Sequence, residues 1–321
     1  MIQSLARLLM GLAPAIPDPN DPTLRERFNL REFREASDID RRRFMMAIAR
    51  SRYESECEMH IHKLFGLSQE RLAALLRGKT VMELGCFVGG SVVAHAEAYD
   101  VGEMYGVDIQ DEFLEAARLY TDKKQGRFQF LKGYGEAIPL PDGSCDAIIT
   151  QDTIEHVNDV SATLAECYRV LKSSGLLFCV FPSFYHPWGN HLGMVTKMPW
   201  LHLLFSDRVI EGAYRQIVDR RGEAAYWYRP DNAMSMHRQR FHGVNGITAG
   251  RFKRLAMHRR FPIVYRNVAP LFSVGRTIQR RPMLKILSLP LKPLASLPVL
   301  EEMFLHRACY ILQRPPITWR A

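Results

Sequence analysis

Hydrophobic and polar positions along residues 80–182 alternate between two periods. Short apolar runs predict buried strands, and stretches with apolar residues every three or four positions predict helices between them. The expected strands are 80–86, 103–109, 127–133, 145–151 and 176–182, and the expected helices are 91–99, 111–121 and 159–172. Strands and helices that alternate at these lengths predict an α/β fold. We expect a doubly wound, Rossmann-like, mostly parallel sheet with helices on both faces.

The residues before this alternation, 1–79, predict an N-terminal helical segment. The first stretch, MIQSLARLLMGLAPAIP, favours an amphipathic helix over a secretion signal, because Arg7 interrupts the apolar run and no basic residues precede it. The prolines of residues 17–22 predict a turn, and the charged pattern from Arg25 to about Arg77 predicts further helices.

The alternation stops after Pro182, where residues 183–243 contain ten aromatic side chains in 61 positions. This composition predicts an insertion after the fifth strand, which acts as an aromatic substrate lid or forms a small apolar core of its own. Residues 80–182 and 244–314 form the predicted core, which ends with a helix at 247–259 and strands at 261–267 and 308–314. Between these strands the Leu- and Pro-rich stretch 282–300 predicts a loop that covers apolar surface, since its prolines prevent a continuous helix.

The composition excludes several classes of protein. An apolar share of 47% in 321 residues is too high for a disordered chain. No uncharged apolar run approaches the roughly 18 residues that span a bilayer. The six cysteines form no CxxC pair, so we expect reduced thiols and a cytoplasmic location, with peripheral attachment to the inner face of the membrane as an alternative.

The net charge of +9 is unevenly distributed. Residues 238–321 carry 16 Lys and Arg against two Glu, which gives +14, and the rest of the chain carries −5. Basic residues next to the apolar stretch 282–300 favour a peripheral contact with an anionic membrane through 238–321. A phosphorylated or carboxylated acceptor and a plain solvated basic surface are the alternatives.

The first predicted strand ends in a glycine-containing turn, Glu83-Leu84-Gly85-Cys86-Phe87-Val88-Gly89-Gly90. Glycines let the backbone approach a ligand closely, and the next helix offers its N-terminal amides. The second strand ends at Asp108, whose carboxylate can accept both hydroxyls of a ribose. This combination predicts an adenosine-containing cofactor. The spacing Gly85-x3-Gly89 differs from GxGxxG and disfavours a dinucleotide.

The sequence here resembles the class I S-adenosylmethionine-dependent methyltransferases, in the subgroup of quinone and small-molecule methyltransferases. VMELGCFVGG is similar to the first motif of that family and GVDIQ to the second, and residues 135–157 and 166–182 are similar to its later motifs. The resemblance implies S-adenosylmethionine as cofactor and S-adenosylhomocysteine as product. It implies a cofactor-binding set with Gly85 at the methionine end, Asp108 on the ribose, Ile109 on the adenine face, Glu136 and Ala137 at the adenine edge, Gln151 near the methionine amine, and Glu83 and Gly89 in the same set. Core packing is the alternative for Ile109 and Ala137.

Phe87 departs from the family pattern, because it occupies the position of the middle glycine of the first motif. We expect a right-handed or extended backbone there, with the ring packed beside the cofactor. A strained, degenerate site is the alternative.

Methyl transfer from a sulfonium needs in-line positioning and removal of a proton from the acceptor. Three histidines near the cofactor-facing edge are candidates for the base: His156, His186 and His191. A structural role is the alternative for each of them. Two sets could bind a metal, Asp152-x-x-Glu155-His156 and His186-x4-His191-x10-His202, but neither has the compact spacing of a zinc site, so we expect no metal.

The sequence therefore predicts a methyltransferase for a small, largely apolar or aromatic acceptor. A catalytically silent cofactor-binding partner protein, an RNA methyltransferase and a dehydrogenase are the alternatives. We expect no nucleic-acid partner, because QDTIEH stands where base-amino methyltransferases carry an Asn/Asp-Pro-Pro-aromatic motif. The acceptor's identity and the oligomeric state are not predicted.

Overall fold

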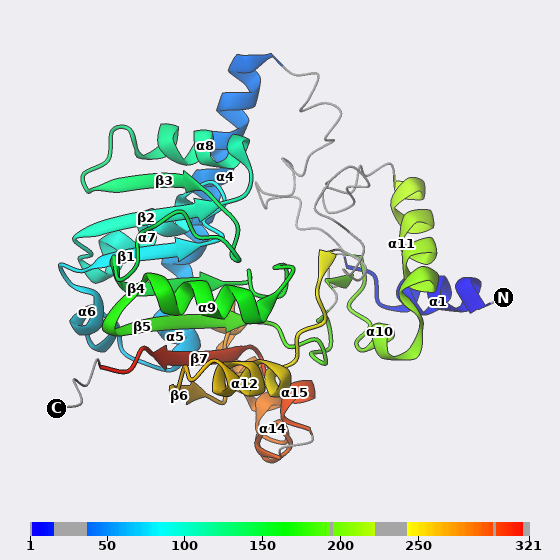
Figure 1. Ribbon diagram of the computed structural model, residues 1–321. Helices are drawn as coiled ribbons and strands as arrows, with labels where there is room; N and C mark the ends of the chain where they lie inside the picture. The colour runs from blue at the N-terminus through cyan, green and yellow to red at the C-terminus, as the bar shows by residue number, and fades with distance from the viewer. Residues whose placement is uncertain are drawn as a thin grey trace.

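The computed structural model describes residues 2–15, 37–189, 191–192, 195–221, 243–297 and 300–316. Within these residues seven strands form one sheet in the order β3-β2-β1-β4-β5-β7-β6 (Figure 1). The strands are β1 Thr80–Leu84, β2 Glu103–Asp108, β3 Phe128–Lys132, β4 Cys145–Gln151, β5 Leu171–Phe181, β6 Ile263–Asn267 and β7 Ala308–Gln313. Strands β1 to β5 are parallel, and β7 runs antiparallel to β5 and β6. The predicted mostly parallel sheet is confirmed.

Helices cover both faces of the sheet, as predicted. Because side chains alternate across a strand, neighbours such as Val81 and Met82 of β1 contribute to different apolar clusters. Val81 packs with α5 Ile61–Phe65, α6 Gln69–Leu76, α7 Gly90–Tyr99 and α8 Asp111–Thr121. Met82 packs with α9 Val160–Val170 and α12 Ala249–His258 on the other face. Strand β5 begins at Leu171, five residues before the expected start, and a register shift in its pairing with β4 accommodates the extra length.

Helix α4 (Asp38–Glu58) crosses the outer surface of α7 and α8 and brings its C-terminal half toward the sheet. Ser37 caps it by accepting a hydrogen bond from the amide of Asp40. Met45 and Ile48 on the inner side of this helix belong to a small apolar cluster. This helix places residues of the N-terminal segment beside β1.

The predicted amphipathic first helix is present as α1 (Ile2–Leu12), and it packs on the insertion, apart from the sheet (Figure 1). Its Ala6 and Met10 are buried together with Ile210 and Tyr214 of α11 (Asp207–Arg221). Next to α11 lies α10 (Leu201–Leu204). The described part of the insertion therefore has a small core of its own, shared with α1. Residues 222–242 of the predicted lid lie outside the described residues.

The expectation of a loop at 282–300 is wrong. This stretch forms a 3-10 helix, η4 Pro282–Ser288, and the helix α14 Leu291–Ser296, flanked by α13 Arg276–Arg280 and α15 Glu301–Phe304. The prolines do prevent one continuous helix, since Pro290 lies between the two. The stretch also exposes apolar side chains that were expected to cover surface, with Met283 88% and Ile286 66% exposed. None of the described helices is long and apolar enough to cross a membrane.

Candidate functional site

The carboxyl ends of β1 and β4 lie side by side at the point where the strand order reverses. Open parallel sheets bind ligands in the crevice at such a point. The turn after β1 is left-handed at three residues, Gly85 (φ 79°), Phe87 (φ 49°) and Gly89 (φ 77°). The predicted glycine turn therefore lies where a ligand would approach the backbone.

Phe87 differs from the expectation, because its backbone is left-handed rather than right-handed or extended. A non-glycine residue in this conformation costs about 1–2 kcal/mol. Its ring packs on Phe113 of α8, with the ring centroids 4.3 Å apart, and the guanidinium of Arg52 lies 5.5 Å from the ring centre. These contacts hold the side chain against the neighbouring helices.

Asp108 at the end of β2 turns its carboxylate toward this turn. Its Oδ2 accepts a hydrogen bond from the amide of Phe87 at 3.0 Å, and its Oδ1 accepts one from the amide of Gln110 at 3.1 Å. Burial raises the pKa of this carboxyl, and the amides of Gln110 and Phe87 oppose that rise. Each oxygen has a second lone pair that can accept a further donor, such as a sugar hydroxyl.

Glu83 belongs to a buried network that sequence reasoning missed. His95 of α7 lies between two carboxylates, with Nδ1 3.1 Å from Glu83 Oε2 and Nε2 3.1 Å from Glu56 Oε1. Ser91 donates to the other oxygen of Glu83 at 2.6 Å. Both oxygens of Glu83 are therefore engaged within the fold. One feature of the sequence could have indicated this network. A histidine interrupts an otherwise apolar stretch of helix, VVAHA, and the preceding strand has a carboxylate near its end.

Gln151, the last residue of β4, connects this network to the crevice. Its Nε2 lies 3.4 Å from the second oxygen of Glu56, and its Oε1 is buried without a hydrogen-bond partner. An unpaired buried acceptor next to a carboxylate is suited to a positively charged amine. The predicted position of Gln151 near an amine is compatible with this geometry.

The structure gives less support to the three residues expected around an adenine. Glu136 accepts a hydrogen bond from the amide of Asp159 at 2.8 Å, and the amide of Ala137 donates to the carbonyl of Tyr134 at 3.0 Å. Ile109 is half-buried. The two polar groups thus have partners within the chain, and their roles toward a cofactor stay predictions.

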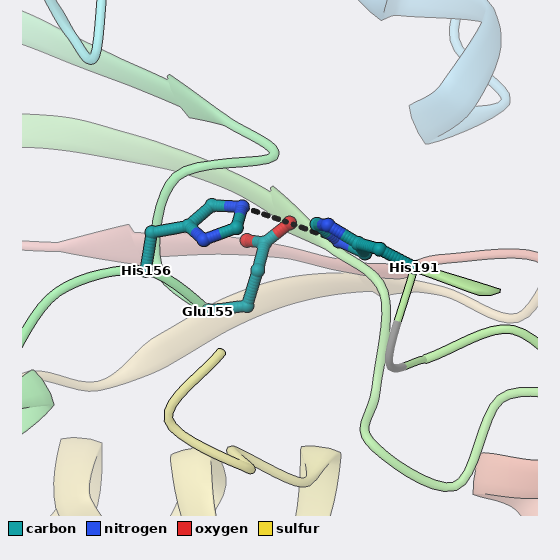
Figure 2. Close-up of side chains that lie close together, drawn as sticks. All are labelled: Glu155, His156 and His191. Atoms are coloured by element: carbon teal, nitrogen blue, oxygen red, sulfur yellow. Dashed lines mark ion pairs between the residues drawn. The ribbon is translucent and has the colours of Figure 1, made fainter. Parts of the chain in front are cut away.

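Two of the predicted histidines meet one buried carboxylate. Oε1 of Glu155 lies 4.0 Å from His156 Nε2 and 3.8 Å from His191 Nε2, and Figure 2 shows this oxygen between the two imidazoles. The two rings are 4.9 Å apart between centroids. His156 and Glu155 come from the loop after β4, whereas His191 comes from the insertion. The structure therefore brings His191 to Glu155 and His156, with which it shares no local motif.

The remaining candidates do not join this cluster. His186 is buried, its Nδ1 accepts from the amide of Trp188, and burial holds its pKa well below the usual range. His202 lies 2.7 Å from the carbonyl of Phe184. Asp152 forms an ion pair with Arg307 at 3.2 Å. Neither metal set that the sequence suggested is assembled among the described residues, since each contributes only part of the cluster at Glu155.

Comparisons with known proteins agree with this arrangement. Residues 82–179 match the family model described as a methyltransferase domain. The chain is 32% identical over 107 residues to a ubiquinone biosynthesis O-methyltransferase of Thiobacillus denitrificans, covering 33% of this chain and 45% of that protein. It is 41% identical over 75 residues to a ubiquinone/menaquinone biosynthesis C-methyltransferase of Methylobacterium nodulans, covering 23% and 30%. It is 29% identical over 123 residues to a probable S-adenosylmethionine-dependent methyltransferase of Mycobacterium tuberculosis, covering 36% and 39%. The chain thus spans less than half the length of these relatives.

Proposed function

Because the chain belongs to the class I S-adenosylmethionine-dependent methyltransferases, we propose that it methylates a small, largely apolar or aromatic acceptor. The observation that carries the cofactor part of this proposal is the Asp108 carboxylate, which faces the left-handed glycine turn at the switch point of the sheet. S-adenosylmethionine, when bound, supplies a methyl group already activated on a sulfonium.

The residues at the crevice fit this cofactor. Asp108 has free lone pairs for the ribose hydroxyls, and Gly85 lets the backbone take the left-handed turn beside Thr153 at the proposed methionine end. The unpaired Oε1 of Gln151 and the carboxylate of Glu56 would receive the ammonium. Glu83 would act indirectly, because Ser91 and His95 already occupy its oxygens.

Proton removal from the acceptor falls to the cluster of Glu155, His156 and His191 in this proposal. His156 Nδ1 lies 3.2 Å from the carbonyl of Gly243, which favours the tautomer with the proton on Nδ1 and leaves Nε2 as the acceptor atom. Glu155 lies within 4.0 Å of both Nε2 atoms and would stabilise either ring once it is protonated. Burial lowers the pKa of both His156 and His186, but only His156 has the carboxylate of Glu155 to oppose that shift, so His186 is the weaker candidate.

Replacing Asp108 with Ala tests the cofactor site. We expect S-adenosylhomocysteine to bind the variant about a hundredfold more weakly, because hydrogen bonds to a charged group contribute about 1.5–3 kcal/mol each. Isothermal titration calorimetry measures this change. Asp122→Asn, an exposed substitution after α8, is the matched control and should bind like the parent. Absence of binding by the parent would reject the proposed function, and equal affinity of parent and Asp108→Ala would reject the ribose contact.

Phe87 favours a second candidate, a cofactor-binding partner protein without turnover. A left-handed phenylalanine at the family's glycine position is the strained alternative that the sequence raised. This candidate predicts that S-adenosylhomocysteine binds while no pool of small acceptors yields methylated product. Product formation from any acceptor, lost on replacing His156 or His191, would favour the enzyme.

We also propose a peripheral contact with an anionic membrane surface through residues 281–297. The exposed apolar side chains of Met283 and Ile286 lie next to exposed cations at Arg281, Lys285 and Lys292. Each such cation contributes roughly 1 kcal/mol near anionic lipid, and each buried apolar side chain adds to that attraction.

Liposome flotation tests this contact. We expect the protein to float with vesicles that contain phosphatidylserine and to dissociate from them at high salt. With neutral vesicles it should remain unbound in the bottom fraction. Met283→Ser combined with Ile286→Ser should weaken binding by about tenfold or more. Met257→Ser is the matched control, because Met257 is 69% exposed on α12, outside this surface. Binding that ignores both lipid charge and the double substitution would exclude the contact.

A further inference from the structure

We propose that Glu155, His156 and His191 bind one divalent transition-metal ion, with ligands from both the core and the insertion. Their ligand atoms all lie within 4.8 Å of one another. The sequence predicted no metal, and these are the same three side chains to which the proposed function assigns proton removal.

The buried carboxylate of Glu155 is the strongest indication. Glu155 is 2% exposed, and neither of its side-chain oxygens has a hydrogen-bond partner among the described residues. An unpaired buried charge costs several kcal/mol, so such a group binds a cation or takes up a proton. The imidazole nitrogens of His191 and His156, at 3.8 and 4.0 Å, are beyond hydrogen-bond distance. The gap between the oxygen and the imidazoles is therefore where a shared ion would sit.

The imidazoles are oriented as ligands. Because the Nδ1 proton of His156 points to the carbonyl of Gly243, its Nε2 lone pair faces Glu155. Metal-binding histidines are commonly fixed by such a hydrogen bond from the other ring nitrogen. His191 also presents Nε2 to the same oxygen, from a residue with φ 63°.

The set of ligands selects the class of ion. Two imidazoles and one carboxylate suit zinc, iron or cobalt, whereas magnesium and calcium prefer oxygen ligands. Three protein ligands leave a position open for water or another small ligand. Two ligands at about 2.1 Å from one ion at a tetrahedral angle lie about 3.4 Å apart, so binding would require modest side-chain rotations that bring the three together. Asp152 is excluded from the set by its ion pair with Arg307.

Metal binding and the proposed base role exclude each other at any one moment, because each Nε2 has one lone pair. The metal-loaded and metal-free forms therefore differ in which groups can accept a proton. This makes metal content a property to measure before any assay of turnover.

Cobalt titration of the chelator-stripped full-length protein tests the site. We expect one Co²⁺ per chain with a visible absorption band, displaced by Zn²⁺ and unaffected by Mg²⁺. Glu155→Gln and His191→Ala should each weaken binding by about a hundredfold or more, beyond the effect of residues that only support ligands. Glu155→Gln removes an unpaired charge, so it should leave the fold intact, which circular dichroism checks. His258→Ala, an exposed histidine on α12, is the matched control and should bind like the parent.

Two results would overturn the site: no cobalt binding by the parent, or binding that Glu155→Gln and His191→Ala leave unchanged. Calorimetry with S-adenosylhomocysteine separates this inference from the proposed function. A protein that binds cobalt and no S-adenosylhomocysteine retains the metal site and loses the proposed function. The opposite result retains the function and loses the metal site.

Discussion

The free energy of unfolding is expected to fall as pH rises from 7 to 10, because His95 loses its proton in that range. Burial alone would lower the pKa of His95, but the carboxylates of Glu56 and Glu83 outweigh it and raise the pKa to about 10. In the unfolded chain the pKa is about 6.5. The native state therefore holds a proton that the unfolded state has released, and stability decreases with pH by up to about 1.4 kcal/mol per unit. Urea denaturation followed by circular dichroism at several pH values measures this slope.

Replacing His95 with Gln isolates its contribution from that of other groups. Cysteine thiols titrate in the same range, and burial raises the pKa of several of them in the folded protein, including Cys145 to about 11. We expect His95→Gln to lose about 3–5 kcal/mol at pH 7, because two buried carboxylates are left without their cation. The difference from the parent should shrink as pH approaches 10. A difference that stays constant with pH would show that His95 is not charged in the native state.

A double substitution checks that the loss comes from the charges. His95 stacks on Tyr99 and lies near His60, so its removal also changes packing. In the His95→Gln background, Glu56→Gln removes one of the two carboxylates that have lost their cation. The other carboxylate, Glu83, still accepts the hydrogen bond from Ser91. This double variant should be more stable than His95→Gln alone. Equal or lower stability would assign the loss to packing.

The strands and the glycine turn after β1 could be predicted because their signals are local. Short apolar runs and intervening helical periods predicted each strand of the sheet to within a few residues, except β5, whose early start at Leu171 follows from pairing with β4. The glycines at 85 and 89 and the carboxylate of Asp108 are likewise read from spacing alone. Both kinds of signal depend on neighbours in sequence.

The remaining features depend on contacts between distant segments. Glu56 reaches His95 only because α4 packs across α7, and His191 reaches Glu155 only because the start of the insertion lies beside the loop after β4. No pattern in either segment specifies those distances. Phe87 was misjudged for a related reason, since its left-handed backbone is held by Phe113 and by the hydrogen bond that its N–H donates to Asp108.

Gly85→Ala is expected to destabilise the fold by about 2–4 kcal/mol. A Cβ at this position would lie 2.2 Å from Thr153 Oγ1 and 2.7 Å from its Cγ2, and the backbone has φ 79°. Thr153 cannot move freely, because its hydroxyl donates to the carbonyls of Leu84 and Gln151. The left-handed backbone costs an alanine about 1 kcal/mol, and the overlap adds about 1–3 kcal/mol. Urea denaturation at pH 7 measures the loss.

Gly143→Ala is the matched control, because Gly143 has φ 61° and no atom within 4 Å of the Cβ position. Gly143→Ala has the same left-handed backbone but no overlap, so its free energy of unfolding should fall by only about 1 kcal/mol. Thr153→Ala combined with Gly85→Ala removes the two closest atoms and should recover part of the loss. The two single variants should also differ in binding. An overlap that displaces Thr153 also moves the carbonyl of Gln151, so we expect Gly85→Ala to weaken the binding of S-adenosylhomocysteine and Gly143→Ala to leave it unchanged. Equal loss in the two single variants would mean that the turn at Gly85 yields to the added methyl group, and that the close contact with Thr153 does not hold its shape.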